Sequence, residues 1–173
     1  RITVGPERSV VVHADDNLVE RVTTEVDAGV LHVSTRGNFT ASSPMYVDVS
    51  VGSLDAVTLS GAGAITVQGV DADALRVELP GTGTGLVTVS GSAQRLTARL
   101  AGTGDLQLAE LQARDAEVTL SATGTGRIAV HVTSTLRATL SGDGEILYSG
   151  SPRVIERVTG TGAILAAPDN GTR

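Results

Sequence analysis

A leucine followed two residues later by Gly-x-Gly returns along the chain at nearly constant spacing. The apolar residue of each copy stands two positions before the first glycine, and successive copies lie 20, 21, 20, 20 and 18 residues apart. These residues are Leu59, Leu79, Leu100, Leu120, Leu140 and Val158. Repeats of this length are too short to enclose a core alone, so they predict a solenoid of stacked coils.

Glycine fills all but one of the Gly-x-Gly positions, and the exception is Ala122. Because glycine reaches positive φ without a Cβ clash, and because stacked coils crowd the same corner, we expect structural corners there. Two copies, PGTGTGLV and SATGTGRI, hold two extra residues that we expect to bulge from the surface. The corner glycines are Gly61, Gly63, Gly81, Gly83, Gly102, Gly104, Gly124, Gly142, Gly144, Gly160 and Gly162.

Apolar residues alternate with polar ones on both sides of each corner. Before the corner, Leu75, Val77 and Leu79 alternate with Arg76 and Glu78. A period of two indicates strands with one buried face, and stacked coils pair such strands in parallel. The sequence therefore predicts an all-β solenoid of roughly eight coils, each ~20 residues long.

The same stacking predicts which outward charges lie side by side. Glu78 falls beside Arg99 of the next coil, and Glu117 falls beside Arg137. Opposite charges on neighbouring strands stabilise a sheet slightly. We therefore interpret these charges as a solvated outer ladder.

The composition argues against several kinds of ligand. The net charge of −6 disfavours a polyanionic partner such as nucleic acid, and the absence of lysine disfavours the G-K-[ST] phosphate loop. Strand residues follow each Gly-x-Gly where a dinucleotide fold needs a helix. The chain has no cysteine, and His13, His32 and His131 lack metal-ligand spacing. We predict no catalytic residue, no cofactor, no metal ligand and no transmembrane segment.

The two ends depart from the repeat. Residues 1–56 fit it poorly, so we expect them to form capping and irregular coils of the same domain as the regular coils at 57–167. Thr35 to Pro44 is typical of a loop, and residues 168–173 are expected to be a disordered tail. No export signal stands at Arg1.

The last coils predict an apolar outer surface. One outward column turns from polar to apolar toward the C-terminus: Thr66, Thr88, Gln107, Ala129, Leu147 and Leu165. Strict alternation points Glu156 inward, which is costly, so we expect a local bulge around Ile155 and Glu156. We predict that Leu147, Leu165 and Ile155 form a self-association or partner surface; the alternative is that the tail or the N-terminal segment covers them.

The motif series resembles a known bacterial family. VTLSGAGAITVQG, VELPGTGTG, RLAGTGDLQL and TLSGDGEI, preceded by HADDNLVERVTTEVDAGVLHVS, are similar to the putative auto-transporter adhesins with a head GIN domain, from about Ser9 to Ala166. The resemblance implies a single-stranded right-handed parallel β-helix, exported and associated with the cell envelope, without established enzymatic activity. It supplies no catalytic or binding residues.

Three functions are compatible with these observations. The first is a non-catalytic envelope or secreted module with an adhesin-like or structural role, whose partner is an unknown protein or glycan of the cell surface. The second is a polysaccharide-active β-helix enzyme, which a cleft of convergent carboxylates would favour. The third is a scaffold that polymerises end to end, which a flat uncovered end would favour. We interpret the sequence as the first and expect an extracytoplasmic location.

Overall fold

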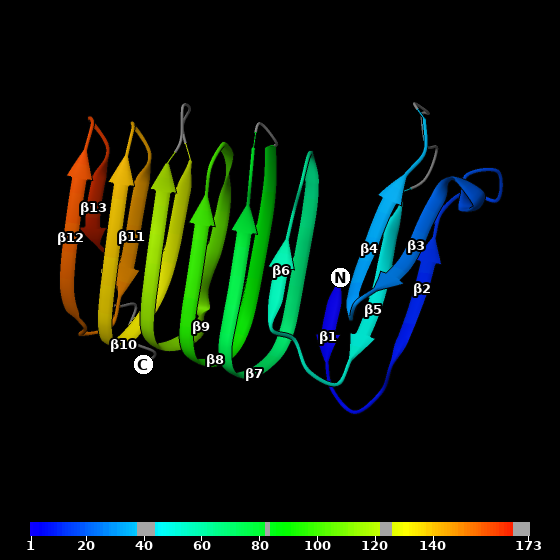
Figure 1. Cartoon of the computed structure of the whole chain (residues 1–173), viewed down its shortest axis with the longest axis horizontal. Helices are drawn as coiled ribbons and strands as arrows, with labels where there is room; N and C mark the ends of the chain where they lie inside the picture. The colour runs from blue at the N-terminus through cyan, green and yellow to red at the C-terminus, as the bar shows by residue number, and fades with distance from the viewer. Residues whose placement is uncertain (38–43, 82–83, 122–125, 168–173) are drawn as a thin grey trace.

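The chain folds into a parallel β-solenoid closed at its N-terminal end by an irregular cap (Figure 1). The computed structural model describes residues 1–37, 44–81, 84–121 and 126–167. The expected tail at residues 168–173 lies outside this part, as do portions of the expected Thr35–Pro44 loop and of both two-residue insertions. Four long strands, β7 (Gly63–Leu79), β8 (Thr84–Leu100), β9 (Thr103–Ser121) and β10 (Arg127–Ser141), pair in parallel in chain order.

Each long strand bends near its middle and so contributes to two facing walls. Register shifts mark these bends, as between Val67 and Val70 of β7. We call the segments that precede each Gly-x-Gly the pre-corner wall and those that follow it the post-corner wall. β11 (Glu145–Ser149) and β13 (Ala163–Ala166) extend the post-corner wall, whereas β12 (Arg153–Thr159) extends the pre-corner wall.

The core lies between the two walls and follows the predicted alternation. Leu79, Leu100, Leu120 and Leu140 are neighbours in the strand register and are 0% exposed. In the part of the chain that the structure describes, no polar or charged residue is buried. Burial of these aliphatic side chains is the main force that holds the coils together.

The solenoid has about five turns, so the expectation of roughly eight is wrong. The N-terminal residues account for the difference, because they form a cap rather than regular coils. β1 (Ile2–Val4) pairs in parallel with β7 on one side and with β5 (Tyr46–Val51) on the other. β2 (Ser9–His13) then pairs antiparallel with β5 and closes this edge, while β6 (Ala56–Thr58) begins the pre-corner wall beside β7.

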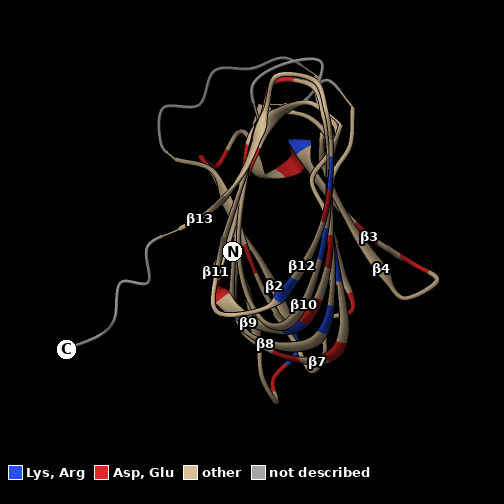
Figure 2. Cartoon of the chain, turned by 90° about the vertical axis from the view of Figure 1, so that its left-hand side faces the viewer, with Lys and Arg blue, Asp and Glu red and all other residues tan. Residues whose placement is uncertain are grey.

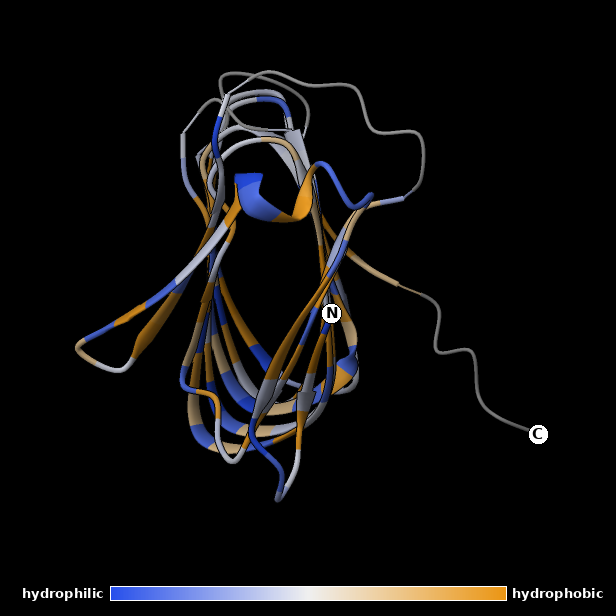
Figure 3. Ribbon diagram, turned by 90° about the vertical axis from the view of Figure 1, so that its right-hand side faces the viewer, coloured by the Kyte–Doolittle hydropathy of each residue, from blue (hydrophilic) through white to orange (hydrophobic). Residues whose placement is uncertain are grey.

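A separate hairpin projects from the cap (Figure 3). The short 3-10 helix η1 (Val19–Arg21) leads into β3 (Val22–Asp27), which pairs antiparallel with β4 (Val30–Thr35). Ala28 and Gly29 join the strands with φ values of 47° and 83°. A two-residue turn with positive φ at both positions matches the twist of a hairpin, which explains the tight reversal.

The last coil continues the register without the bulge that we expected around Ile155 and Glu156. β12 pairs residue by residue with β10, from Thr135–Arg153 to Ser141–Thr159. Glu156 therefore stacks beside Ala138, whose side chain faces the core. Its carboxylate is nevertheless exposed, because no further coil among the described residues pairs with β12. The open end removes the desolvation cost on which the expectation rested.

No helix among the described residues combines the length and the apolar character that crossing a membrane would require.

Candidate functional site

The first glycine of most corners adopts a conformation that other residues avoid. Its φ lies in the left-handed region in four corners, where a Cβ atom would be strained. These glycines are Gly61 (φ 100°), Gly81 (φ 80°), Gly142 (φ 116°) and Gly160 (φ 126°).

The second glycine has a different role, because it allows two coils to approach closely. A Cβ atom on Gly104 would lie 2.5 Å from the carbonyl oxygen of Gly85, and one on Gly144 would lie 2.6 Å from that of Gly126. Neither Gly104 nor Gly144 has a positive φ, so the expected conformational reason does not apply to them. The backbone of the neighbouring coil fills this space, which leaves no cradle for a ligand.

Two glycines of this column escaped the sequence analysis. Gly85, rather than Gly83, pairs with both Gly63 and Gly104, and Gly126 occupies the equivalent place in the other coil with an insertion. Gly83 and Gly124 lie outside the described residues. Counting backward from the second strand segment, instead of forward from the leucine, would have identified the last glycine of GTGTG at 81–85 and of ATGTG at 122–126.

The predicted surface residues Leu147, Ile155 and Leu165 do not all lie together. Leu147 and Leu165 are register neighbours on the post-corner wall, where Leu165 is 46% exposed and Leu147 is half-buried. Ile155 is 39% exposed and stands beside Arg137 on the pre-corner wall. The open end also leaves Val158 exposed. The apolar positions therefore surround the last coil rather than forming one continuous patch.

The three histidines occupy separate parts of the fold. His131 shares a hydrogen bond with the Ser149 hydroxyl across 2.9 Å, and His32 lies opposite Glu25 in the hairpin. The Nε2 atom of His13 lies 3.1 Å from Asp48 in the cap. Within the described ranges, no group of three or more His, Cys, Asp or Glu side chains is placed to hold a metal ion.

A small aromatic cluster stabilises the edge of the cap. The ring of Tyr46 stacks on His13 at 4.4 Å between centroids, and the Arg1 guanidinium lies 4.1 Å from the Tyr46 centroid. Asp48 pairs with Arg1 at 2.9 Å. Partial burial lowers the pKa of the Arg1 amino group, an effect that the nearby Asp48 carboxylate opposes. These contacts tie β1, β2 and β5 together.

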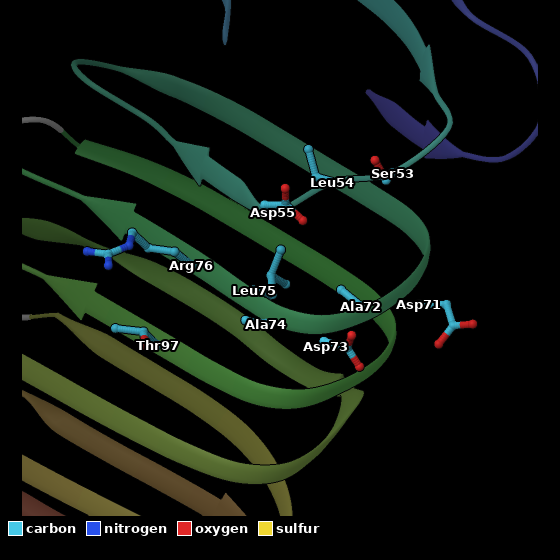
Figure 4. Close-up of a pocket in the computed structure, with 10 residues that line it drawn as sticks. All are labelled: Ser53, Leu54, Asp55, Asp71, Ala72, Asp73, Ala74, Leu75, Arg76 and Thr97. Carbon is cyan, nitrogen blue, oxygen red and sulfur yellow. The ribbon is translucent and has the colours of Figure 1, made fainter. Parts of the chain in front are cut away.

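A hollow of about 540 Å³ lies where the cap joins the first coil (Figure 4). Asp55, Asp71 and Asp73 stand around it, together with the Arg76 stem and small side chains of the bend. All three carboxylates are exposed to solvent. Asp71 accepts a hydrogen bond from Ser92 (3.2 Å), and the Arg76 guanidinium donates to Glu78 (3.2 Å) instead of to an aspartate. These three aspartates are not shielded from water, whereas carboxylates that act as general acids or bases are commonly desolvated.

Charged residues gather along the pre-corner wall, at the right-hand edge of the solenoid in Figure 2, where β12 is labelled. Glu78 is the register partner of Arg99, and Glu117 is that of Arg137, as predicted. Glu78, however, forms its ion pair within its own strand, with Arg76 at 3.2 Å. On the post-corner wall, Arg127 and Glu145 pair between coils at 2.9 Å.

The comparisons with known proteins agree with this architecture. The family model described as putative auto-transporter adhesin, head GIN domain, matches residues 1–152. A comparison with curated proteins finds no match.

Solved structures share the fold at low sequence identity. A putative adhesin from Bacteroides fragilis superposes with a TM-score of 0.76 at 21% identity, covering 96% of this chain and 86% of the other. A putative lipid binding protein from Parabacteroides distasonis gives 0.53 at 21% identity, with 96% and 87% covered. A putative adhesin from Parabacteroides merdae gives 0.51 at 20% identity, with 96% and 86% covered. At these identities the likeness shows the fold alone.

Proposed function

Since the chain belongs to the family described as putative auto-transporter adhesin, head GIN domain, we propose that it is a non-catalytic binding module of the cell envelope. Its ligand is a protein or glycan of the cell surface, and its location is extracytoplasmic. The family description and the adhesin descriptions of two structural neighbours support this role.

The single observation that carries the proposal is the complete division between core and surface. The described core is entirely apolar, and each described polar or charged side chain remains in contact with solvent. Enzymes stabilise transition states with polar groups that are fixed in a site shielded from water. Exposed groups on a rigid wall suit recognition better, because a partner supplies the desolvation when it docks.

The hollow beside the cap does not favour the polysaccharide-active alternative. Its three aspartates are exposed, and the nearest guanidinium, that of Arg76, is engaged by Glu78. A lyase or hydrolase would need a general base shielded from water and a free positive group for the developing charge.

Binding and turnover measurements on the purified chain test the proposal. Beads coated with residues 1–173 should attach saturably to a panel of immobilised cell-surface glycans and envelope proteins. The same chain, incubated with those glycans, should release no new reducing ends. Attachment no greater than that of albumin-coated beads, or steady release of sugar ends, would contradict the proposed role.

Association between copies of the chain is a second candidate, and the apolar residues exposed on the last described coil favour it. β12 and β13 are edge strands, and Ile155, Val158 and Leu165 are exposed beside them. Exposed edge strands with apolar neighbours associate unless something covers them. We propose that Leu147 and Leu165 on one wall and Ile155 on the other contact a second copy.

Light scattering at high protein concentration tests this second candidate. The Leu147→Asp, Leu165→Asp double variant should be monomeric while the unmodified chain associates. Thr66→Asp with Thr88→Asp is the matched control, because these residues occupy the same column at the opposite end. An unmodified chain that is already monomeric, or equal association of all three proteins, refutes it.

A further inference from the structure

Arginines are concentrated on the outer face of the pre-corner wall. The register places six of them at outward positions there: Arg76, Arg95, Arg99, Arg137, Arg153 and Arg157. The acidic residues at outward positions of this described wall are Glu78, Asp115 and Glu117. The wall is therefore locally positive although the whole chain carries a net charge of −6.

The post-corner wall provides an internal comparison, because it has the same strands and the same spacing. Outside the bends, its described coil segments carry one arginine, Arg127, beside Asp105 and Glu145. Arg127 is paired with Glu145 at 2.9 Å. Basic residues are thus concentrated on one wall of the solenoid and not on the other.

Five of the six arginines on the pre-corner wall form no close ion pair with a described carboxylate. Arg76 pairs with Glu78, but within the described ranges no carboxylate lies within 4.0 Å of the other five guanidinium groups. All five side chains are exposed. Three of the five nevertheless stand directly beside an acid in the register: Arg95 by Asp115, Arg99 by Glu78 and Arg137 by Glu117. Arg153 and Arg157 stand beside threonines instead, so the excess of positive charge is greatest on the last coil.

The last two coils hold the densest group. Arg137 stands directly beside Ile155, and Arg153 and Arg157 flank Ile155 two residues away on the same face. Diagonal neighbours on adjacent strands lie within reach of long side chains. Thr135 and Thr139 stand beside Arg153 and Arg157 and add hydroxyl groups to the cluster. We call these three arginines and two threonines the arginine cluster.

We propose that the pre-corner wall binds an acidic polysaccharide, with the arginine cluster holding its carboxylate groups. This inference rests on the proposed binding role and names the ligand class and the site. A guanidinium matches a carboxylate with two parallel hydrogen bonds, and the threonine hydroxyls suit the hydroxyl groups of sugars. A wall of stacked strands also offers a long, flat track for an extended chain.

Two acidic residues that lie between the arginines of this wall favour a polysaccharide over nucleic acid as the ligand. Asp115 and Glu117 stand between Arg95 and Arg99 on one side and Arg137 on the other. They would repel a polymer with a phosphate on every unit, whereas they can accept hydrogen bonds from sugar hydroxyls. The outward positions of this described wall also carry no aromatic ring on which bases could stack.

Affinity measurements with polygalacturonate as the probe test the proposal on the full chain of residues 1–173. The unmodified chain should bind polygalacturonate, and the affinity should fall as salt increases. The Arg137→Gln, Arg153→Gln, Arg157→Gln triple variant should bind roughly tenfold more weakly or worse, since charge-assisted hydrogen bonds are lost. Arg127→Gln on the other wall is the matched control and should retain the affinity. Equal melting temperatures establish that both variants are folded.

The possible results distinguish failure of the arginine cluster as the binding site from failure of the proposed non-catalytic binding role. Binding to dextran as strong as to polygalacturonate, binding to single-stranded DNA that is equal or tighter, or an unaffected triple variant would overturn the arginine cluster as the site. Absence of binding to polygalacturonate would overturn it too, while attachment to other surface molecules would leave the binding role intact. Reducing ends released from polygalacturonate would instead overturn the non-catalytic role.

Discussion

At the scale of single residues, stability depends on which face of a strand a side chain occupies. Leu100 is 0% exposed, between Leu79 and Leu120 in the core. Leu100→Ala should lower the free energy of unfolding by about 2–5 kcal/mol, because it leaves a cavity as well as losing buried area. Urea denaturation followed by circular dichroism measures this change.

Leu86 of the same strand is the matched control for this substitution. Its side chain is 37% exposed on the outer face. Leu86→Ala should therefore change the free energy of unfolding by about 0.5 kcal/mol or less. Equal losses for the two leucines would show that the inward and outward assignments are wrong.

Gly104 tests the close approach of neighbouring coils. Gly104→Val should destabilise the chain by about 1–3 kcal/mol, because its Cβ would meet the Gly85 carbonyl oxygen at 2.5 Å. Gly5 has nothing within 4 Å of a built Cβ, so Gly5→Ala should leave the melting temperature nearly unchanged. Thermal melts compare the two, and a Gly104→Val protein as stable as the original would contradict the packing that we describe.

Single residues also show how far the sequence alone could predict this fold. The leucine column was predictable because each member repeats at a fixed spacing with a polar neighbour on either side. The reason why position 104 requires glycine could not be predicted, since a crowded backbone and a positive φ both favour glycine in the sequence. Gly85 and Gly126 were missed because two extra residues displace the glycine that stacks.

At the scale of elements, the cap was harder to predict than the coils. The sequence indicates that residues 1–56 differ from the repeat, but not how they pair. Ile2 lies between Val49 and Val67, and such distant partners leave no periodic signal. The antiparallel β2 likewise breaks the pattern of parallel stacking. The coils, in contrast, pair with neighbours about 20 residues away, so their spacing reveals their partners.

The β3–β4 hairpin should be the least stable element among the described strands. It pairs only with itself in the described structure, and Val26 and Val30 near its turn are 69% and 54% exposed. An isolated two-stranded hairpin is marginally stable in water. Native-state hydrogen exchange should therefore show its amides exchanging at least ~tenfold faster than those of β9. Protection equal to that of β9 would show that another surface covers the hairpin.

At the scale of the whole molecule, net charge is a poor guide to what one surface can bind. The net charge of −6 led us to disfavour polyanionic ligands in general, and the strand register then showed a wall with six arginines and three acids at its outward positions. The net charge of the chain cannot reveal that arginines are concentrated on one wall, because residues that are neighbours on the wall are about one coil apart in sequence. The right-handed sense of the winding stays a prediction.

The core, the open last coil and the arginine cluster all depend on one register, which places Arg137 beside Ile155. Because the chain has no cysteine, a pair of new cysteines reports this register directly. Directly paired strand residues are ~5 Å apart, within the Cα separation that a disulfide needs, whereas a slip of one residue moves the side chain to the other face. The account predicts that the Arg137→Cys, Ile155→Cys variant forms an intramolecular disulfide under mild oxidation, measured by non-reducing mass spectrometry, and that Arg137→Cys, Glu156→Cys does not. Cross-linking of the second variant in preference to the first would contradict it.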